Sequence, residues 1–216
     1  MSSATEARTR RVGILLYPDV EVLDAAGPFE VFTCASRMAQ RASPEAPPPF
    51  SVHTLALAAG PVRARAGLRM LADQALAQAA PPDVWLVPGG VVDAALADAE
   101  LLAQIARLAA GAEITASVCT GAFLLAAAGL LPPGTPVTTH WEDAADLARA
   151  HPRLAVDATR RYLDNGRLVT AAGISAGIDM ALHLVARLAG PALAERTARQ
   201  MDVVWTRDLW QGRPLR

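Results

Sequence analysis

The chain has 216 residues, of which 52% are apolar and 19% are charged, so it can bury one large hydrophobic core in a single domain. Its 20 basic and 21 acidic residues give a formal net charge of −1. Nothing in this balance argues for a nucleic-acid partner or for binding to an anionic membrane surface.

We identify no targeting segment near the start of the sequence. Residues 1–11 are polar, and the apolar run after them is interrupted by Pro18 and Asp19. That run is shorter than a secretory signal core or a membrane-spanning helix requires. We therefore expect a cytoplasmic protein, in which Cys34 and Cys119 stay reduced and form no disulfide.

The first part of the chain begins with an apolar run at 11–18 that is typical of a strand. Residues 24–41 carry apolar positions at helical spacing and predict a helix that opens near Pro28. After a proline-rich connection, a second strand is predicted at 50–57. Residues 62–76 follow, and we expect them to form a short hairpin and then a helical turn.

The middle of the chain repeats the alternation. A third strand is predicted at 83–90 and runs into a double glycine. Helical spacing follows over 91–111, with a break near Asp98. A fourth core strand is predicted at 113–118, and the run at 120–131 predicts the helix after it.

The last part of the chain is mostly helical. An amphipathic helix is predicted at 141–152, and two closing helices are predicted at 175–190 and 191–204. Between them, Asn165-Gly166 separates two alternating runs within 159–173, which is a strong signal for a β-hairpin.

Strands therefore alternate with helices over most of the sequence. This pattern predicts a single-domain α/β fold of the flavodoxin-like kind, with a mostly parallel sheet and helices on both faces. We expect the domain to span 11–203, with a disordered tail at 1–10 and a C-terminal extension at 204–216. Ligands of such sheets bind beyond the carboxyl ends of the strands, where each candidate residue below lies.

Cys119 lies between a predicted strand and a predicted helix, and Thr120 and Gly121 follow it. This order is typical of a nucleophile elbow, in which a sharp turn exposes the reactive side chain. Unpaired N–H groups at the helix start favour a thiolate, so we expect the thiol pKa to be lowered. Gly121 would permit the turn, and Thr120 would hydrogen bond beside the sulfur. The alternative, a buried packing residue, is our interpretation of Cys34.

Two residues are candidate partners for the thiol. Asp24 lies where the loop after the first strand enters its helix, and its apolar neighbours would raise its pKa and suit it to acid–base work. An N-cap role is the alternative for Asp24. His140 follows a short extended run and could line the same pocket. We expect structural roles for His53, His151 and His183, and solvated positions for Asp19, Glu21 and Glu30.

Gly89 and Gly90 follow the third strand directly. Two glycines there allow backbone N–H groups to face a bound group closely, and such groups stabilise developing negative charge. A plain turn is the alternative for this dipeptide.

Taken together and in order, several motifs resemble the ThiJ/PfpI superfamily. They are LLYPDVEVLDAAGPFEVF, VPGG, SVCTGAFLLAAAGLL, TTHW and AAGISAGIDMALHLV, within a span from about Arg11 to about Val203. The resemblance implies the class I glutamine-amidotransferase-like fold, with Cys119 as the nucleophile and Asp24 as the acid that faces it. It also implies that the glycines of VPGG form the oxyanion side. Thr120 stands where some branches carry a histidine base, which weakens a peptidase or amidase interpretation.

Two branches of the superfamily are most similar. One is isonitrile hydratase, which adds water to an isocyanide to give an N-formamide. The other is the ligand-sensing domain of AraC-type regulators, to which Phe123 and the segment 160–170 are closer. Those regulators continue into a helix-turn-helix domain of the kind that binds DNA, and we find none in this sequence. We therefore expect a small-molecule substrate and neither a nucleic-acid nor a membrane partner.

The resulting hypothesis is a cofactor-free, metal-free, cysteine-dependent hydro-lyase of the isonitrile hydratase type. One alternative is a small-molecule-binding or redox-sensing module in which Cys119 is oxidised or lines a pocket. Another is a glyoxalase-like or deglycase-like enzyme. We also expect a homodimer, with exposed Val31 and Phe32 of the first helix, and Trp205 and Trp210 near the chain end, as candidate interface residues.

Overall fold

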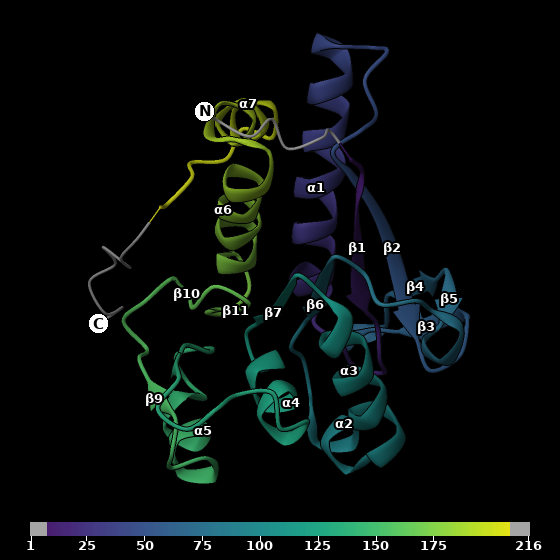
Figure 1. Ribbon diagram of the computed structural model, residues 1–216. Coiled ribbons are helices and arrows are strands. Elements are labelled where there is room, and N and C mark those ends of the chain that lie inside the picture. The colour runs from purple at the N-terminus through teal and green to yellow at the C-terminus, as the bar shows by residue number, and fades with distance from the viewer. Residues whose placement is uncertain (1–7, 208–216) are drawn as a thin grey trace.

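The centre of the molecule is a seven-stranded sheet, seen in a computed structural model that describes residues 8–207 (Figure 1). Its strands are β1 (Arg10–Leu15), β2 (Phe50–Ala56), β5 (Gln74–Ala75), β6 (Val84–Val87), β7 (Ile114–Val118), β10 (Tyr162–Asp164) and β11 (Leu168–Ala171). They lie in the order β10-β11-β7-β6-β1-β2-β5. Every neighbouring pair is parallel except β10–β11, which confirms the predicted mostly parallel sheet.

Helices lie on both faces of this sheet. They are α1 (Val22–Ala42), α2 (Asp93–Ala97), α3 (Ala99–Gly111), α4 (Gly121–Ala127), α5 (Ala144–Ala150), α6 (Ala176–Ala189) and α7 (Pro191–Gln200). α1, α6 and α7 pack against one another on one face, and α2, α3 and α4 pack together on the other (Figure 1). Within residues 8–207, none of the helices is both long enough and apolar enough to cross a membrane.

Short elements complete the fold. They are the hairpin strands β3 (Gly60–Arg63) and β4 (Arg69–Ala72), the pair β8 (Pro136–Val137) and β9 (Ala155–Val156), and the 3₁₀ turns η1 (Arg65–Gly67) and η2 (Leu76–Gln78). The hairpin and the helical turn after it were predicted, whereas the β8–β9 pair was not. Two-residue strands carry too little periodicity to be read from a sequence.

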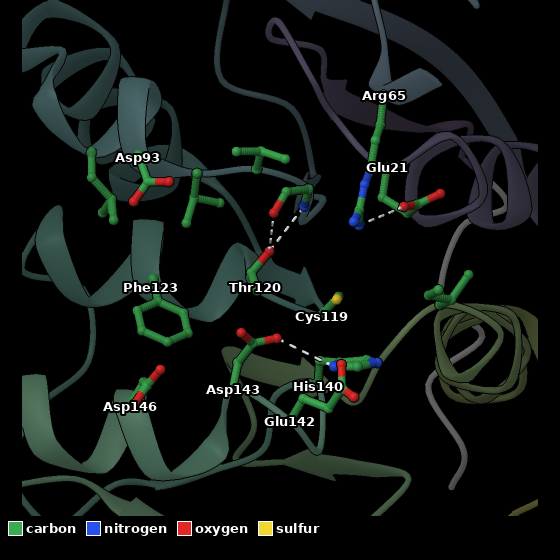
Figure 2. A pocket seen from close by; sticks show the side chains of 15 residues that line it. Glu21, Arg65, Asp93, Cys119, Thr120, Phe123, His140, Glu142, Asp143 and Asp146 are labelled. Carbon is green, nitrogen blue, oxygen red and sulfur yellow. Dashed lines mark hydrogen bonds and ion pairs between the residues drawn. The ribbon is translucent and has the colours of Figure 1, made fainter. Parts of the chain in front are cut away.

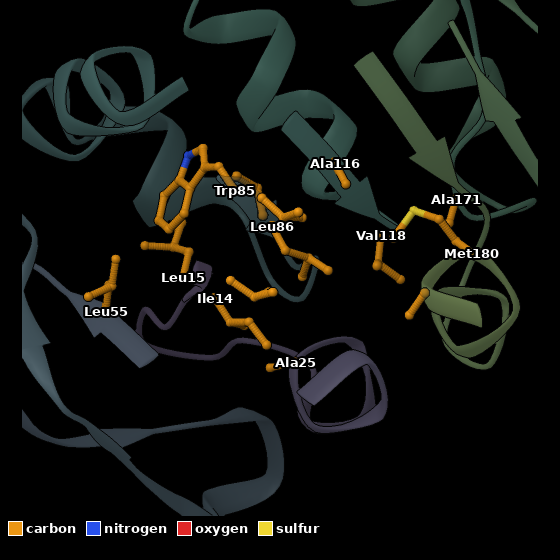
Figure 3. Packing of buried hydrophobic residues seen from close by; sticks show 14 of the residues in the cluster. Ile14, Leu15, Ala25, Leu55, Trp85, Leu86, Ala116, Val118, Ala171 and Met180 are labelled. Atoms are coloured by element: carbon orange, nitrogen blue, oxygen red, sulfur yellow. The ribbon is translucent and has the colours of Figure 1, made fainter. Parts of the chain in front are cut away.

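The main core fills the space between the sheet and its helices. All residues of β6 and β7 are buried, as expected for parallel strands covered on both faces. Figure 3 shows Trp85 of β6 beside Leu15, and Val118 facing Met180 of α6. Burial of such side chains stabilises the fold by roughly 1.5–3 kcal/mol each, so the core holds the strand ends of the site rigidly in place.

Two local signals in the sequence are confirmed by the structure. The predicted helix at 91–111 is broken at Asp98, whose side chain accepts a hydrogen bond from Leu101 N at 3.0 Å and caps α3. The Asn165-Gly166 hairpin joins β10 to β11, with Gly166 at φ +82° and its N–H donating to Asp164.

Helix boundaries differ from the predicted ones where a local cause overrides the apolar pattern. α1 begins at Val22, so Pro28 lies inside the helix rather than near its first turn. α4 ends at Ala127 rather than Leu131 because Gly129 adopts φ +72°, a left-handed conformation that stops a helix. α7 ends at Gln200, and Asp202 takes φ +53° shortly after it.

The predicted interface residues of the first helix were placed wrongly. Val31 and Phe32 are fully buried, and Phe32 packs edge-on against Phe50, so neither is exposed to a partner. Trp205 is half-buried, and its indole N–H donates to Asp179 O at 3.2 Å. Trp210 lies outside the described residues, and the homodimer stays a prediction.

The ends of the predicted domain are only partly described. Arg10 already belongs to β1, so the strand takes in the last residue of the predicted tail. Residues 1–7 of that tail and 208–216 of the predicted extension lie outside the described residues.

The turn between β7 and α4 lies directly against the end of β6. A Cβ atom on Gly121 would lie 2.9 Å from Pro88 O and closer still to Val87 O. Both are backbone atoms of a buried region, so they cannot move aside cheaply. Only glycine at position 121 allows the two strand ends to meet at this distance.

We expect Gly121→Ala to lower the free energy of unfolding by about 1–3 kcal/mol or more, because the new methyl group must separate β6 from α4. Urea denaturation of the variant and the wild type measures this loss. Ala127→Ser is the control, since it adds one heavy atom at an exposed position of the same helix. A loss at Gly121 no larger than that of the control would contradict the close approach.

Candidate active site

Cys119 lies on a strained turn between β7 and α4. Its φ is +56°, a left-handed conformation that non-glycine residues rarely adopt. Its N–H donates to Ala171 O at 3.0 Å and its carbonyl accepts from Thr139 Oγ1 at 2.7 Å, so neighbouring segments hold the turn in place. The side chain is 7% exposed and lines a cavity of about 390 Å³. The local geometry is that of the predicted nucleophile elbow.

Asp24 is fully buried in the first turn of α1. Its Oδ2 accepts a hydrogen bond from Gly89 N at 3.0 Å, and its Oδ1 has no hydrogen-bond partner among the described residues. Burial raises the pKa of Asp24 from 3.8 to about 7, against the lowering effect of the Gly89 N–H. Glu21, not Asp24, is the N-cap residue of α1, so the N-cap alternative for Asp24 is wrong.

The ionisation of Cys119 differs from the expectation. Burial raises the pKa of the thiol to about 12, and the negative charge of Asp24 adds to that effect. The Thr120 N–H and hydroxyl favour the thiolate, but burial outweighs them. α4 has only seven residues, and its N-terminal end does not lower this pKa below the ordinary value. The free protein therefore holds a thiol at neutral pH.

The two glycines after β6 are held by specific hydrogen bonds. The Gly89 N–H donates to Asp24, while the Gly90 N–H donates to Thr120 Oγ1 and the Gly90 carbonyl accepts from it, both at 2.9 Å. Gly90 also adopts φ +145°, and a Cβ there would lie 2.7 Å from Glu21 N. Both N–H groups thus have partners within the protein. Their oxyanion role stays a prediction, and it requires a substrate to replace one of those partners.

His140 lines the cavity, as predicted. Its Nδ1 lies 3.2 Å from Asp143 Oδ2, and its ring fills the space where a side chain on Gly173 would stand. Figure 2 shows His140 and Cys119 among the residues that line the cavity, with a dashed line that joins His140 to Asp143. His183 is instead paired with Asp164 of β10 at 2.7 Å and is not among the residues that line the cavity, in keeping with its expected structural role.

Several residues of the site were not predicted from the sequence. Glu21 was expected to be solvated, but its side chain is only 21% exposed, lies 3.3 Å from Arg65 and lines the cavity with it (Figure 2). Ile174 lines the same cavity at φ +48°, which is an outlier for a β-branched residue. Tyr17 is buried, and its hydroxyl donates to Pro88 O at 3.1 Å. The motif AAGISAGID was the one sequence signal for Ile174.

The comparisons with known proteins agree with this geometry. Residues 10–187 match the DJ-1/PfpI family. Isonitrile hydratase of Pseudomonas putida is 35% identical over 194 residues, which cover 89% of this chain and 78% of that protein. A crystal structure of a ThiJ/PfpI family protein from Pseudomonas syringae superimposes with a TM-score of 0.77 at 28% identity, covering 97% of this chain and 78% of the other.

Transcription regulators are also similar. The HTH-type transcriptional regulator GbdR of Pseudomonas aeruginosa is 31% identical over 183 residues, which cover 85% of this chain but 48% of that protein. The chain thus spans about half the length of this relative. The family match covers most of the chain, and the elbow cysteine and both packed glycine turns lie within it. The chain therefore belongs to the DJ-1/PfpI family.

Proposed function

We propose that this protein is a cysteine-dependent hydratase that converts a small isocyanide to an N-formamide, with Cys119 as nucleophile and Asp24 as the acid–base group. One observation carries the proposal: a fully buried carboxyl with an unpartnered oxygen lies beside a cysteine that lines a cavity. The likeness to the isonitrile hydratase of Pseudomonas putida over most of both chains supports the choice of reaction.

The raised pKa values indicate where the proton lies before the reaction. Near pH 7 the sulfur is protonated, while the carboxyl of Asp24 is close to half ionised and can take a proton. As Sγ bonds to the terminal carbon of R–N≡C, the thiol proton passes to Asp24 and then to that carbon. The product of this step is a thioimidate, R–N=CH–S–Cys119.

Water completes the reaction without any oxidant or reductant. Its oxygen adds to the thioimidate carbon while Asp24 accepts one proton, and the C–S bond then breaks. One hydrogen of the water ends on nitrogen and the other returns to the sulfur, so R–NH–CHO leaves and the thiol is restored. The strained elbow keeps the sulfur at one position through both steps.

A ligand-sensing domain is the second candidate function. The resting thiol, with its raised pKa, is a weak nucleophile before substrate enters, and GbdR is similar to this chain over 183 residues. In this case the cavity binds a small molecule and Cys119 only lines it. A cytoplasmic location and a homodimer fit either candidate and belong to the proposal.

We expect Cys119→Ala to lower the rate of formamide production from an alkyl isocyanide by at least ~10³-fold, because the covalent intermediate cannot form. Cys34→Ala is the control and should stay within a few-fold of the wild type, since Cys34 is a buried packing residue of α1. Equal rates for wild type and Cys119→Ala would remove the nucleophile. If the wild type hydrates none of several isocyanides, the reaction assignment is wrong, and consumption of methylglyoxal would favour the glyoxalase-like alternative.

The pH dependence of kcat/KM should show the ionisation of Asp24. We expect the rate to rise as pH passes through about 7 and to level off above it, because the carboxylate form accepts the thiol proton. Asp24→Asn should remove this rise and most of the activity. The rise should persist in His140→Gln; its disappearance there would assign it to the imidazole instead.

The same carboxyl should make stability depend on pH. The folded-state pKa of Asp24 is raised, so the folded protein binds a proton more tightly than the unfolded chain does. Its stabilising effect is present at low pH and is lost as pH rises from about 4 through about 7. For the shift to about 7, the loss amounts to about 4 kcal/mol.

We therefore expect the stability of Asp24→Asn relative to wild type to increase by up to about 4 kcal/mol between pH 4 and pH 8. Chemical denaturation at both pH values measures the difference. Glu45→Gln, at an exposed carboxylate in the loop after α1, is the control and should show no such increase. A pH-independent difference for Asp24→Asn would show that this carboxyl is not strained by burial.

A further inference from the structure

The cavity above Cys119 is lined by an excess of negative charge. Its lining contains one guanidinium, that of Arg65, and five carboxylates: Glu21, Asp93, Glu142, Asp143 and Asp146. Arg65 is already paired with Glu21 at 3.3 Å, so it does not offset the other four. A cavity of one charge sign raises the local concentration of ligands of the opposite sign.

The four remaining carboxylates differ in their partners. Asp143 lies 3.2 Å from His140, and Asp146 lies 2.7 Å from Arg149, which is largely exposed and outside the lining. Among residues 8–207, Asp93 and Glu142 have no ion-pair partner. No basic side chain of the described residues therefore neutralises Asp93 or Glu142 in the cavity.

The carboxylates are arranged around an aromatic ring. In Figure 2, Phe123 lies between Asp93 on one side and Asp143 and Asp146 on the other, and Cys119 lies beyond Thr120. We call the part of the cavity formed by Phe123 and these three aspartates the acidic arm. A ring face beside carboxylates suits an organic cation, because the ring attracts positive charge through its quadrupole and also contacts alkyl groups.

The sulfur of Cys119 lines the same cavity, so the acidic arm and the nucleophile share one binding space. Asp24 is fully buried next to this sulfur, is not one of the lining residues, and has an Oδ1 without a hydrogen-bond partner among the described residues. A group that reacts at the sulfur can supply a partner for that oxygen. Among the described residues, no three or more His, Cys, Asp or Glu side chains are placed to hold a metal ion, so the acidic arm is better suited to an organic cation.

We propose that the substrate of this site carries a positively charged ammonium or alkylated amine, held in the acidic arm while its reactive carbon lies at Cys119. The inference rests on the proposed function and narrows its substrate class. Neutral molecules of the same shape enter with less electrostatic attraction, and carboxylates or sulfonates are repelled.

The test compares how fast Cys119 reacts with three methanethiosulfonates of similar size that differ in charge. They are the trimethylammonioethyl, 3,3-dimethylbutyl and sulfonatoethyl reagents, each rate being divided by the reagent's rate with 2-mercaptoethanol and the labelled residue confirmed by mass spectrometry. We expect the cationic reagent to react at least ~10-fold faster than the anionic one at low ionic strength. The ratio should fall as salt is added, because salt screens charges at the cavity mouth.

Charge variants assign the preference to the acidic arm. Asp93→Asn, and more so Asp93→Asn/Asp146→Asn, should lower the ratio several-fold, whereas Glu45→Gln should leave it unchanged. Both aspartates are exposed, so these variants should fold normally. A ratio near one, or a ratio that responds equally to Glu45→Gln, would overturn the proposal.

A second readout does not depend on thiol reactivity. If Cys119 reacts with none of the reagents, choline and its uncharged isostere 3,3-dimethylbutan-1-ol are compared as stabilisers by their effect on Tm. Choline should raise Tm more, and less so in Asp93→Asn/Asp146→Asn; equal shifts would overturn the proposal. If the proposed function is wrong but this inference is right, the protein will not hydrate isocyanides, and the cation will still be preferred over the neutral or anionic probe.

Discussion

The Pro88–Gly90 turn is the contact on which the rest of the site depends. Pro88 O accepts a hydrogen bond from the Tyr17 hydroxyl, and the Gly89 N–H donates one to Asp24. Both backbone groups of Gly90 are hydrogen bonded to Thr120 Oγ1. The segments that follow β1, β6 and β7 therefore contact one another at this turn. Side chains at positions 89, 90 or 121 would separate them, so three glycines set the distance between the thiol and the carboxyl.

Burial is what gives this pair its chemical character. Removing Cys119 and Asp24 from water disfavours both anions, so each pKa rises. Before substrate enters, the proton therefore lies on the sulfur, because the pKa of the thiol is higher than that of the carboxyl. Keeping the Asp24 carboxyl buried lowers the stability of the fold above neutral pH. The strained backbone at Cys119 and Ile174 is a further cost in stability at the same site.

The cavity above the pair has the opposite character, because the carboxylates that line it are partly or largely exposed to solvent. Its acidic lining comes from segments that are far apart in the sequence: Glu21 before α1, Asp93 at the start of α2, and Asp143 and Asp146 around the start of α5. In the proposed function, the buried pair of Cys119 and Asp24 supplies the sulfur and accepts the proton, while the acidic lining selects and orients the substrate.

The sequence by itself determined most of the longer elements and their order. Buried parallel strands, the cap at Asp98, the Asn165-Gly166 hairpin and the elbow at Cys119 all depend on residues close together in the chain, and their local patterns were sufficient. Only the tertiary structure decided the direction of the Cys119 pKa, the use of the Gly89 and Gly90 N–H groups, and the entry of Glu21 and Arg65 into the cavity. Those properties depend on how deeply a group is buried and on neighbours more than 20 positions away, and no local pattern encodes either of them.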